Sequence, residues 1–508
     1  MSYDLFVDLR AIQNYIFSSN KLKDNIGASY IVSTLLNKVE GKDLCKNSSG
    51  DIKSDSGSEN KEEEKGFCGG GNLYLQCKTE DEAKNIVRNL SKRIFEKAPG
   101  LSFNAVILKA EEEKDFSYRM QRLYQKMAEE KRTHHQITTL PSYGINAQCS
   151  AGPLSAQYQD PFEKDKYISE VVYTKRIKLL KNDKENDKED DTISDEYSQY
   201  LSDDFKLTEE FLEISPLKGE DSHIAVVHID GNGIGAIFST LKTLSDYQEF
   251  SKKLNNDMQQ ALRETIKILE DKIRKGEWDY NYKTVNVENV LKYILPLRPI
   301  YIGGDDITFV CEGRLGIELS CIFIEEVQKL LNRDDVSFCA GVAIAKTNFP
   351  FFQIYKAADA LCRSAKNKRL QDIKEEVAKK SDSYIDFHMI NSSVYSNLEK
   401  VRKIQYTSIS GKNILYYRPY KLSEMKKQIE NAKNFARTWP NSKLAKFREV
   451  LYKSEDELTA FKQDINTKIN LPLFYDGFQD FANSDDFFFD NKTIFLDIIE
   501  LIDLLPEE

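Results

Sequence analysis

The chain has 508 residues, of which 40% are hydrophobic and 11% aromatic, so it can bury cores for two to four domains. A net charge of -10 argues against a protein that coats nucleic acid, although a local basic channel stays possible. The 8 cysteines include no CxxC pair, which argues against a zinc site and for a reducing compartment. The acidic N-terminus does not fit a signal peptide, and no apolar run has transmembrane length. We therefore expect a cytoplasmic protein without a membrane contact.

The first third of the chain predicts a strand, a helix, a hairpin and another strand. Residues 5–17 combine an apolar strand pattern with a helical continuation. Residues 67–76 enclose Gly69-Gly70-Gly71-Asn72 between apolar residues, which is typical of a glycine hairpin. Residues 102–108 supply a further strand. The polar tract at residues 41–65 is predicted to be an exposed, mobile loop.

The middle of the chain predicts the same elements in the same order, with longer helices. A buried strand at 223–230 ends in Asp230, and a glycine-rich turn leads into a helix. The elements that follow are a long helix at 249–275, a hairpin at 298–311 around Gly303-Gly304-Asp305-Asp306, a helix, a strand at 338–345 and a helix at 351–366. The order is that of the ferredoxin-like βαββαβ palm of nucleotide cyclases and polymerases.

The two halves resemble each other at two places, which indicates an internal repeat. Asp8 and Ile12 in the first strand–helix unit correspond to Asp230 and Ile234 in the second. In the same alignment Gly71 and Asn72 stand where Asp305 and Asp306 stand. The sequence thus predicts an α+β protein with two palms, of which only the second is catalytic; a chance likeness between two apolar strands is the alternative. We expect Asp8 to cap or hydrogen-bond locally.

We divide the chain into four predicted domains. They are a degenerate first palm at 1–140 with the insertion 41–65, an inter-palm segment at 141–222, a second, catalytic palm at 223–375, and a mainly helical C-terminal domain at 376–508. The charged tract at 181–191 marks the seam between the palms, and helices are predicted at 421–433, 442–453 and 455–468.

The second palm carries a predicted two-metal site. Adjacent carboxylates repel each other unless a cation lies between them, and Mg²⁺ commonly uses one or two carboxylates together with substrate phosphates. We therefore assign Asp230, Asp305 and the carbonyl of Gly231 to Mg²⁺ or Mn²⁺, with Asp306 completing the shell or positioning a hydroxyl. A plain polar hairpin turn is the alternative, and it leaves Asp230 unexplained.

Backbone N–H groups near this site are predicted to hold phosphates of a nucleotide. The residues concerned are Asn232, Gly233, Ile234 and Gly235, together with the turn glycines Gly303 and Gly304. Lys366, on the following helix, is predicted to reach a terminal phosphate, although a solvated helix end would also explain it. Arg363, Lys368 and Arg369 are weaker candidates for the same role, and His228 is expected to be a buried histidine.

With these motifs in place, the chain resembles the large, polymerase-like subunit of type III CRISPR effector complexes. The likeness rests on Gly303-Gly304-Asp305-Asp306, on Asp230, on the helix that ends at Lys366, and on residues 11–16 and 22–29 of the first palm. It implies polymerisation of ATP into cyclic oligoadenylate second messengers for antiviral defence. It also implies guide RNA, target RNA and other effector-complex subunits as partners.

Two departures from that family alter the expectation. The first palm starts almost at Met1 without an HD nuclease domain, so we expect no cleavage of single-stranded DNA, and Cys149 is all that remains of a cysteine cluster. A reduced subunit or a stand-alone cyclase is therefore expected. The alternatives are a stand-alone synthase of a cyclic adenine dinucleotide and a non-catalytic RNA-binding subunit. Phe238 stands where diguanylate cyclases have a guanine-reading Asn, which favours adenine.

Overall fold

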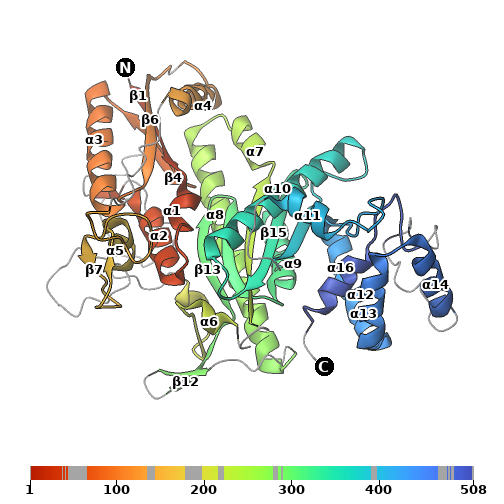
Figure 1. Ribbon diagram of the computed structural model, residues 1–508. Helices are drawn as coiled ribbons and strands as arrows, with labels where there is room; N and C mark the ends of the chain where they lie inside the picture. Colours follow the sequence, from red (N-terminus) through yellow and green to blue (C-terminus); the bar gives the residue numbers. More distant parts are fainter. Residues whose placement is uncertain are drawn as a thin grey trace.

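The computed structural model describes residues 2–505 except for 37, 40, 41, 44–65, 112, 134–143, 178–196, 216–221, 278–283, 288, 289, 391–396, 467–477, 479, 480 and 482–485. Most of the polar tract at 41–65 and all of the charged tract at 181–191 lie outside the described residues. The described chain divides into a first palm, a second palm and a C-terminal group of helices, which follow one another from left to right in Figure 1.

The first palm is a four-stranded antiparallel sheet with helices on its faces. Its elements are β1 (Tyr3–Arg10), α1 (Ile12–Ile16), α2 (Leu22–Leu35), β4 (Gly66–Gly69), β5 (Asn72–Cys77), α3 (Glu80–Lys97), β6 (Ser102–Lys109) and α4 (Phe116–Thr133), with a small ladder of β2 (Lys38–Val39) and β3 (Lys42–Asp43). The strand order is β4-β5-β1-β6. Thr79 caps α3 by accepting from the N–H of Glu82, and three acidic residues in its first turn suit the helix dipole.

The second palm repeats this architecture around a larger sheet. Its elements are β10 (His223–Asn232), α7 (Ile234–Thr240), α8 (Leu244–Lys275), β13 (Leu297–Gly303), β14 (Asp306–Glu312), α9 (Gly316–Leu331), β15 (Ser337–Lys346) and α10 (Phe351–Lys374). The sheet order is β13-β14-β10-β15-β16-β17. Thr243 and Asp246 form a capping box at the start of α8, the helix that the periodic Leu, Ile and Met residues predicted.

The sheet orders confirm the internal repeat. β4, β5, β1 and β6 correspond in order and direction to β13, β14, β10 and β15. Asp8 pairs with Asn72 in one sheet, as Asp230 pairs with Asp306 in the other. The residues before the two equivalent helices, Ala11 at φ 52° and Gly233 at φ 89°, both adopt the left-handed conformation. Two palms of one fold, the predicted α+β class, are therefore present.

Short elements connect the palms. They are β7 (Tyr158–Gln159), β8 (Tyr167–Ile168), α5 (Glu170–Ile177), a 3-10 turn at Ser198–Tyr200, β9 (Phe205–Lys206) and α6 (Phe211–Ile214). Within the second palm, β11 (Thr284–Val287) and β12 (Val290–Ile294) lie between α8 and β13, and β12 pairs with β9. Helix α5 fastens α2, because the buried guanidinium of Arg176 binds Asp24 at 2.6 Å and also pairs with Asp160. A Cβ at Gly27 would lie 1.9 Å from the carbonyl oxygen of Lys175, so the two helix backbones meet where only glycine fits.

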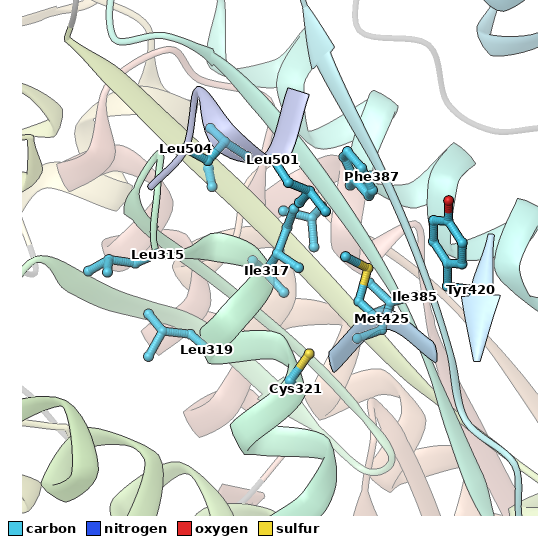
Figure 2. Packing of buried hydrophobic residues seen from close by; sticks show 14 of the residues in the cluster. Leu315, Ile317, Leu319, Cys321, Ile385, Phe387, Tyr420, Met425, Leu501 and Leu504 are labelled. Carbon is cyan, nitrogen blue, oxygen red and sulfur yellow. The ribbon is translucent and has the colours of Figure 1, made fainter. Parts of the chain in front are cut away.

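The C-terminal segment joins the second palm through both its sheet and its core. β16 (Tyr384–Ile390) runs parallel to β15, and β17 (Tyr420–Lys421) closes that edge. The helices are α11 (Leu398–Gln405), α12 (Leu422–Thr438), α13 (Asn441–Leu451), α14 (Glu455–Asn466) and α16 (Phe495–Ile502), which confirms the predicted helices. Figure 2 shows that Ile317 and Cys321 of α9 belong to one cluster of buried side chains with Met425 of α12 and Leu501 of α16. Full burial of a Leu, Ile, Phe or Met side chain stabilises the folded state by about 1.5–3 kcal/mol. The C-terminal helices therefore share one core with the second palm.

The two palms share a hydrophobic core. It includes Leu22 and Ile26 of α2 and Ile300 and Tyr355 of the second palm. At the end of α1, Phe17 stacks on Tyr355 of α10 with ring centroids 3.9 Å apart. The relative position of the palms is thus set by buried apolar contacts. Among the described residues, no helix combines the length and hydrophobicity that crossing a membrane requires.

Candidate active site

The three predicted carboxylates meet where β10 ends and β14 begins. Asp230 is the Cα partner of Asp306 across the β10–β14 ladder, and Gly303 is the partner of Asp306 across the hairpin. The N–H of Gly231 donates to the carbonyl oxygen of Asp305 at 3.1 Å. A Cβ at Gly231 would lie 2.9 Å from the Cβ of Asp305, so a glycine lets the hairpin close over β10. The register therefore brings Asp230, Asp305 and Asp306 together.

The electrostatics of this cluster favour a bound cation. Burial, and then the charge of Asp230, raise the pKa of Asp305 to about 6. Burial, followed by the charges of Asp305 and Asp230, raises the pKa of Asp306 well above its ordinary value. Oδ1 of Asp306 is buried and has no hydrogen-bond partner in the described part of the chain. Asp230 and Asp305 therefore repel each other when both are charged, and a divalent ion bound by both would stabilise them.

Lys366 of α10 is the cation that the fold places against this cluster. Its Nζ contacts Oδ2 of Asp230. Burial by itself would lower the pKa of Lys366, but the charge of Asp230 and the hydrogen bond to it raise the pKa overall. The predicted contact with a terminal phosphate stays a prediction, because the ammonium group is paired with a carboxylate here.

The metal prediction is compatible with this geometry but not shown by it. In the described ranges, no three or more His, Cys, Asp or Glu side chains are gathered closely enough to hold a metal ion. Mg²⁺ that is shared with substrate phosphates needs only one or two carboxylates. Asp230 and Asp305 are donors of the right kind and number, and the orphaned Asp306 oxygen lies beside them.

The predicted phosphate-binding segment forms the turn between β10 and α7. The side-chain amide of Asn232 donates to the carbonyl oxygen of Ser337 at 3.3 Å, so it fastens β10 to β15. Gly233 is left-handed, and a Cβ there would lie 2.3 Å from the carbonyl oxygen of Asp335. Ile234 buries its side chain at the first position of α7, whereas Gly235 borders open space. None of these four residues therefore has a side chain available for a phosphate, so a phosphate contact here would have to use backbone N–H groups.

The hairpin glycines have steric roles. A Cβ at Gly303 would lie 1.9 Å from the hydroxyl oxygen of Tyr301, and Gly304 is left-handed at φ 67°. A Cβ at Gly304 would lie 3.7 Å from Cα of Gly70 in the first palm. The hairpin turns of the two palms thus face each other at van der Waals distance.

The weaker candidates are engaged elsewhere. Arg363 pairs with Asp359, and Lys368 with Asp372, each one turn away on α10. Arg369 donates to the carbonyl oxygens of Lys380 and Asp382. These side chains shape α10 and the loop after it.

Two predictions concern single residues near the repeat. His228 is 3% exposed, and its Nδ1 lies 3.0 Å from Oγ1 of Thr308, which confirms a buried histidine. Asp8 was expected to interact locally, and this was wrong. Its carboxylate pairs with Lys131 of α4 at 2.7 Å, because α4 returns over the sheet to the end of β1.

Phe238 is part of an aromatic cluster under α8. Its ring centroid lies 4.4 Å from that of Tyr247 and 5.0 Å from that of Phe250. The ring therefore fills the junction between α7 and α8, and the adenine prediction depends on the missing Asn rather than on a contact made by Phe238.

One neighbour of the site was missed by the sequence analysis. Nε2 of Gln13, in the first palm, donates to Oδ2 of Asp306 at 3.1 Å. The repeat contained the signal, since Gln13 follows Ile12, the equivalent of Ile234 beside the glycine-rich turn. Only the packing of the two palms against each other shows which side chain crosses the interface.

Comparisons with known proteins agree with this architecture. Residues 223–375 match the family described as Cas10/Cmr2, second palm domain. No curated protein matches the chain.

Solved structures with the same fold span the whole chain. A Csm1-Csm4 cassette in complex with cA4 has a TM-score of 0.55 at 11% identity, covering 99% of this chain and 69% of the other. The cassette in complex with AMPPNP has a TM-score of 0.54 at 12% identity with the same coverage. The Csm1-Csm4 subcomplex of the type III-A CRISPR-Csm interference complex has a TM-score of 0.51 at 12% identity, covering 99% and 70%. The match over the second palm and the shared fold confirm the resemblance to the large palm subunit of type III CRISPR effector complexes that the sequence indicated.

Proposed function

We propose that this chain is a metal-dependent nucleotidyltransferase that joins ATP into cyclic oligoadenylate second messengers in CRISPR-type antiviral defence. The observation that carries the proposal is the register that sets Asp230 opposite Asp306 beside the Gly303-Gly304 turn. The family match over residues 223–375 and the solved relatives in complex with cA4 and AMPPNP support it.

The reaction is an in-line displacement at the α-phosphorus of ATP. A ribose hydroxyl of the acceptor forms the new P–O bond, the bond to the bridging oxygen of the β-phosphate breaks, and pyrophosphate leaves. The hydroxyl proton passes to a carboxylate of the site or to water. Mg²⁺ or Mn²⁺ held by Asp230, Asp305 and the Gly231 carbonyl would lower the pKa of the hydroxyl and neutralise charge on the triphosphate.

Other residues of the second palm position the attacking hydroxyl and bind the phosphates. Asp306 positions the hydroxyl through its unpartnered Oδ1. The backbone N–H groups from Asn232 to Gly235, and those of the Gly303-Gly304 turn, hold phosphate oxygens. Lys366 moves from Asp230 to the terminal phosphate when the nucleotide binds, because a triphosphate carries more charge than one carboxylate.

The first palm binds the acceptor nucleotide. It keeps a glycine turn and a strand–Asp–helix entry but has Asn72 where the second palm has Asp306, so it lacks a second carboxylate for metal. The facing turns at Gly70 and Gly304 bring acceptor and donor sites together, which makes the attack effectively intramolecular.

Partners are proposed from the same relatives. Several of the solved structures are complexes of Csm1 with Csm4, and one is the subcomplex of an interference complex. We propose that this chain likewise assembles with effector-complex subunits, and that guide RNA and target RNA are further partners.

The experiment is incubation of the purified protein with α-labelled ATP and Mn²⁺, followed by chromatography. Cyclic products of three or more adenylates support the proposal. A cyclic dinucleotide alone would favour the stand-alone synthase. Failure to form product in the presence of co-purifying subunits and target RNA would favour the non-catalytic RNA-binding subunit.

A further inference from the structure

A side chain of the first palm contributes to the carboxylate site of the second palm. Gln13 belongs to α1 of the first palm, yet Nε2 donates to Oδ2 of Asp306, 293 residues away in the sequence. Oδ1 of the same carboxylate has no partner in the part of the chain that the structure describes. The amide therefore occupies one oxygen of Asp306 and leaves the other for a ligand.

The repeat shows what is particular to Gln13. Ala11 and Gly233 are the left-handed residues before α1 and α7, and Ile12 and Ile234 are the first helical residues. Gln13 is thus the counterpart of Gly235, at which an added Cβ would meet nothing within 4 Å. The degenerate palm carries an amide where the catalytic palm carries no side chain, and that amide reaches the partner hairpin.

Helix α1 is held firmly enough to aim this side chain. A Cβ at Gly71 would lie 2.2 Å from Cδ1 of Ile12, so the first hairpin packs directly against the start of α1. Phe17 at its end stacks on Tyr355 of the second palm. Lys175 of α5 donates to the carbonyl oxygen of Tyr15 at 2.6 Å. Both ends of this five-residue helix are therefore fixed by groups outside it.

We propose that Gln13 is a positioning residue through which the first palm orients Asp306 for its ligand. The amide donor fixes the rotamer of Asp306 and withdraws Oδ2 from other partners, so that Oδ1 meets the divalent ion or the attacking hydroxyl. This inference rests on the proposed function for the identity of the ligand. It adds that the two palms must be docked for the carboxylate site to be complete.

The test measures Mn²⁺ binding to the full chain by electron paramagnetic resonance, without nucleotide. Gln13→Met keeps the side-chain length but loses the donor, and Gln13→Ala loses both. Each variant is expected to raise the Kd for Mn²⁺ about tenfold, since hydrogen bonds to charged groups are usually worth more than a neutral pair. Asn14→Ala, at the exposed neighbouring position of α1, serves as the matched control and should leave the Kd unchanged.

A double-mutant cycle separates positioning from general damage. If Gln13 acts through Asp306, then Gln13→Met should have no further effect on Mn²⁺ affinity in an Asp306→Ala background. An equal loss of affinity in both backgrounds, or a wild-type Kd for Gln13→Met, would overturn the proposal. Thermal unfolding of each variant shows whether the fold has been kept.

Turnover supplies a second, independent readout. With ATP, Gln13→Met should lower kcat about tenfold and change KM less than about twofold, because the amide touches Asp306 rather than the nucleotide. If wild-type protein binds Mn²⁺ but forms no product, the proposed function fails while the cycle on metal affinity still decides the role of Gln13. If wild-type protein binds no Mn²⁺, both fail.

Discussion

Gly70 of the first palm and Gly304 of the second face each other across the palm interface. A Cβ at Gly304 would lie 3.7 Å from Cα of Gly70, and a Cβ at Gly70 would lie 3.9 Å from Cα of Gly304. Both residues are left-handed, at φ 57° and φ 67°. A side chain at either position would therefore extend into the contact between the two turns.

This contact predicts the effect of a bulky residue at position 70. Gly70→Val should slow linkage formation at least about tenfold, because acceptor and donor are no longer held in reacting geometry. Binding of ATP at the second palm should change by less than about twofold. Product formation and nucleotide binding, measured by chromatography and calorimetry, check the two parts.

Gly411→Val is the matched control for this variant. Gly411 is also left-handed, at φ 73°, but an added Cβ there meets nothing within 4 Å. Both changes strain a left-handed turn, and only the first one enters the palm interface. Equal losses of activity in the two variants would show that strain, and not the facing turns, explains the result.

Removal of the two hairpin carboxylates is predicted to reduce activity strongly while the protein stays folded. Asp305→Ala combined with Asp306→Ala should reduce nucleotidyl transfer at least ~100-fold, since electrostatic groups of this kind contribute ~3 kcal/mol or more to a transition state. Without metal, the melting temperature of the double variant should equal or exceed that of the wild type. The reason is that buried carboxylates that repel each other are removed. Undiminished product formation would refute the assignment of this site.

Nucleotide choice is predicted from position 238. An equimolar mixture of ATP and GTP should be converted mainly to adenine-containing product. Phe238→Asn should lower thermal stability, because the Phe238 ring packs on Tyr247 and Phe250. Mass spectrometry of the products tests the nucleotide prediction, and conversion of the mixture mainly to guanine-containing product by the wild type would contradict it.

The buried ammonium group of Lys175 is expected to make stability depend on pH. Its Nζ donates to the carbonyl oxygen of Tyr15 in α1. Burial lowers its pKa from the ordinary 10.5 to about 8. Below pH 8 the folded and unfolded states both bind this proton; between pH 8 and 10.5 the unfolded state binds more. The free energy of unfolding of the wild type should therefore rise with pH in this window relative to Lys175→Met.

Urea unfolding at several pH values measures this difference, with Lys433→Met at an exposed helical position as the control. The control variant should follow the wild type across the whole range. A parallel pH dependence of the wild type and Lys175→Met would mean that Lys175 keeps an ordinary pKa in the folded protein.

Much of the architecture is encoded in local patterns and could be predicted. The strand alternation, the glycine hairpins at Gly70 and Gly304 and the acidic turn at Asp305 are short-range signals with few structural solutions. The sequence likeness between the segment around Asp8 and the segment around Asp230 allowed the first palm to be predicted from the second. The strand ladders then brought Asp230 and Asp306 into register as expected.

What the sequence left open depends on contacts between distant elements. Gln13 meets Asp306, and Asp8 meets Lys131, only because whole elements dock in one orientation. The same holds for β16, which lies far along the chain and yet extends the sheet of the second palm beyond β15. Side-chain periodicity within one segment does not encode such pairings.

The most direct test of the account is a structure of the protein with Mn²⁺ and an unreactive ATP analogue. The account predicts anomalous signal from Mn²⁺ at Asp230 and Asp305, with the triphosphate along the Asn232–Gly235 turn. A second nucleotide, without metal, should lie at the Gly70 turn of the first palm. A metal-bound triphosphate at Gly71 and Asn72, with no ligand at the second hairpin, would contradict it.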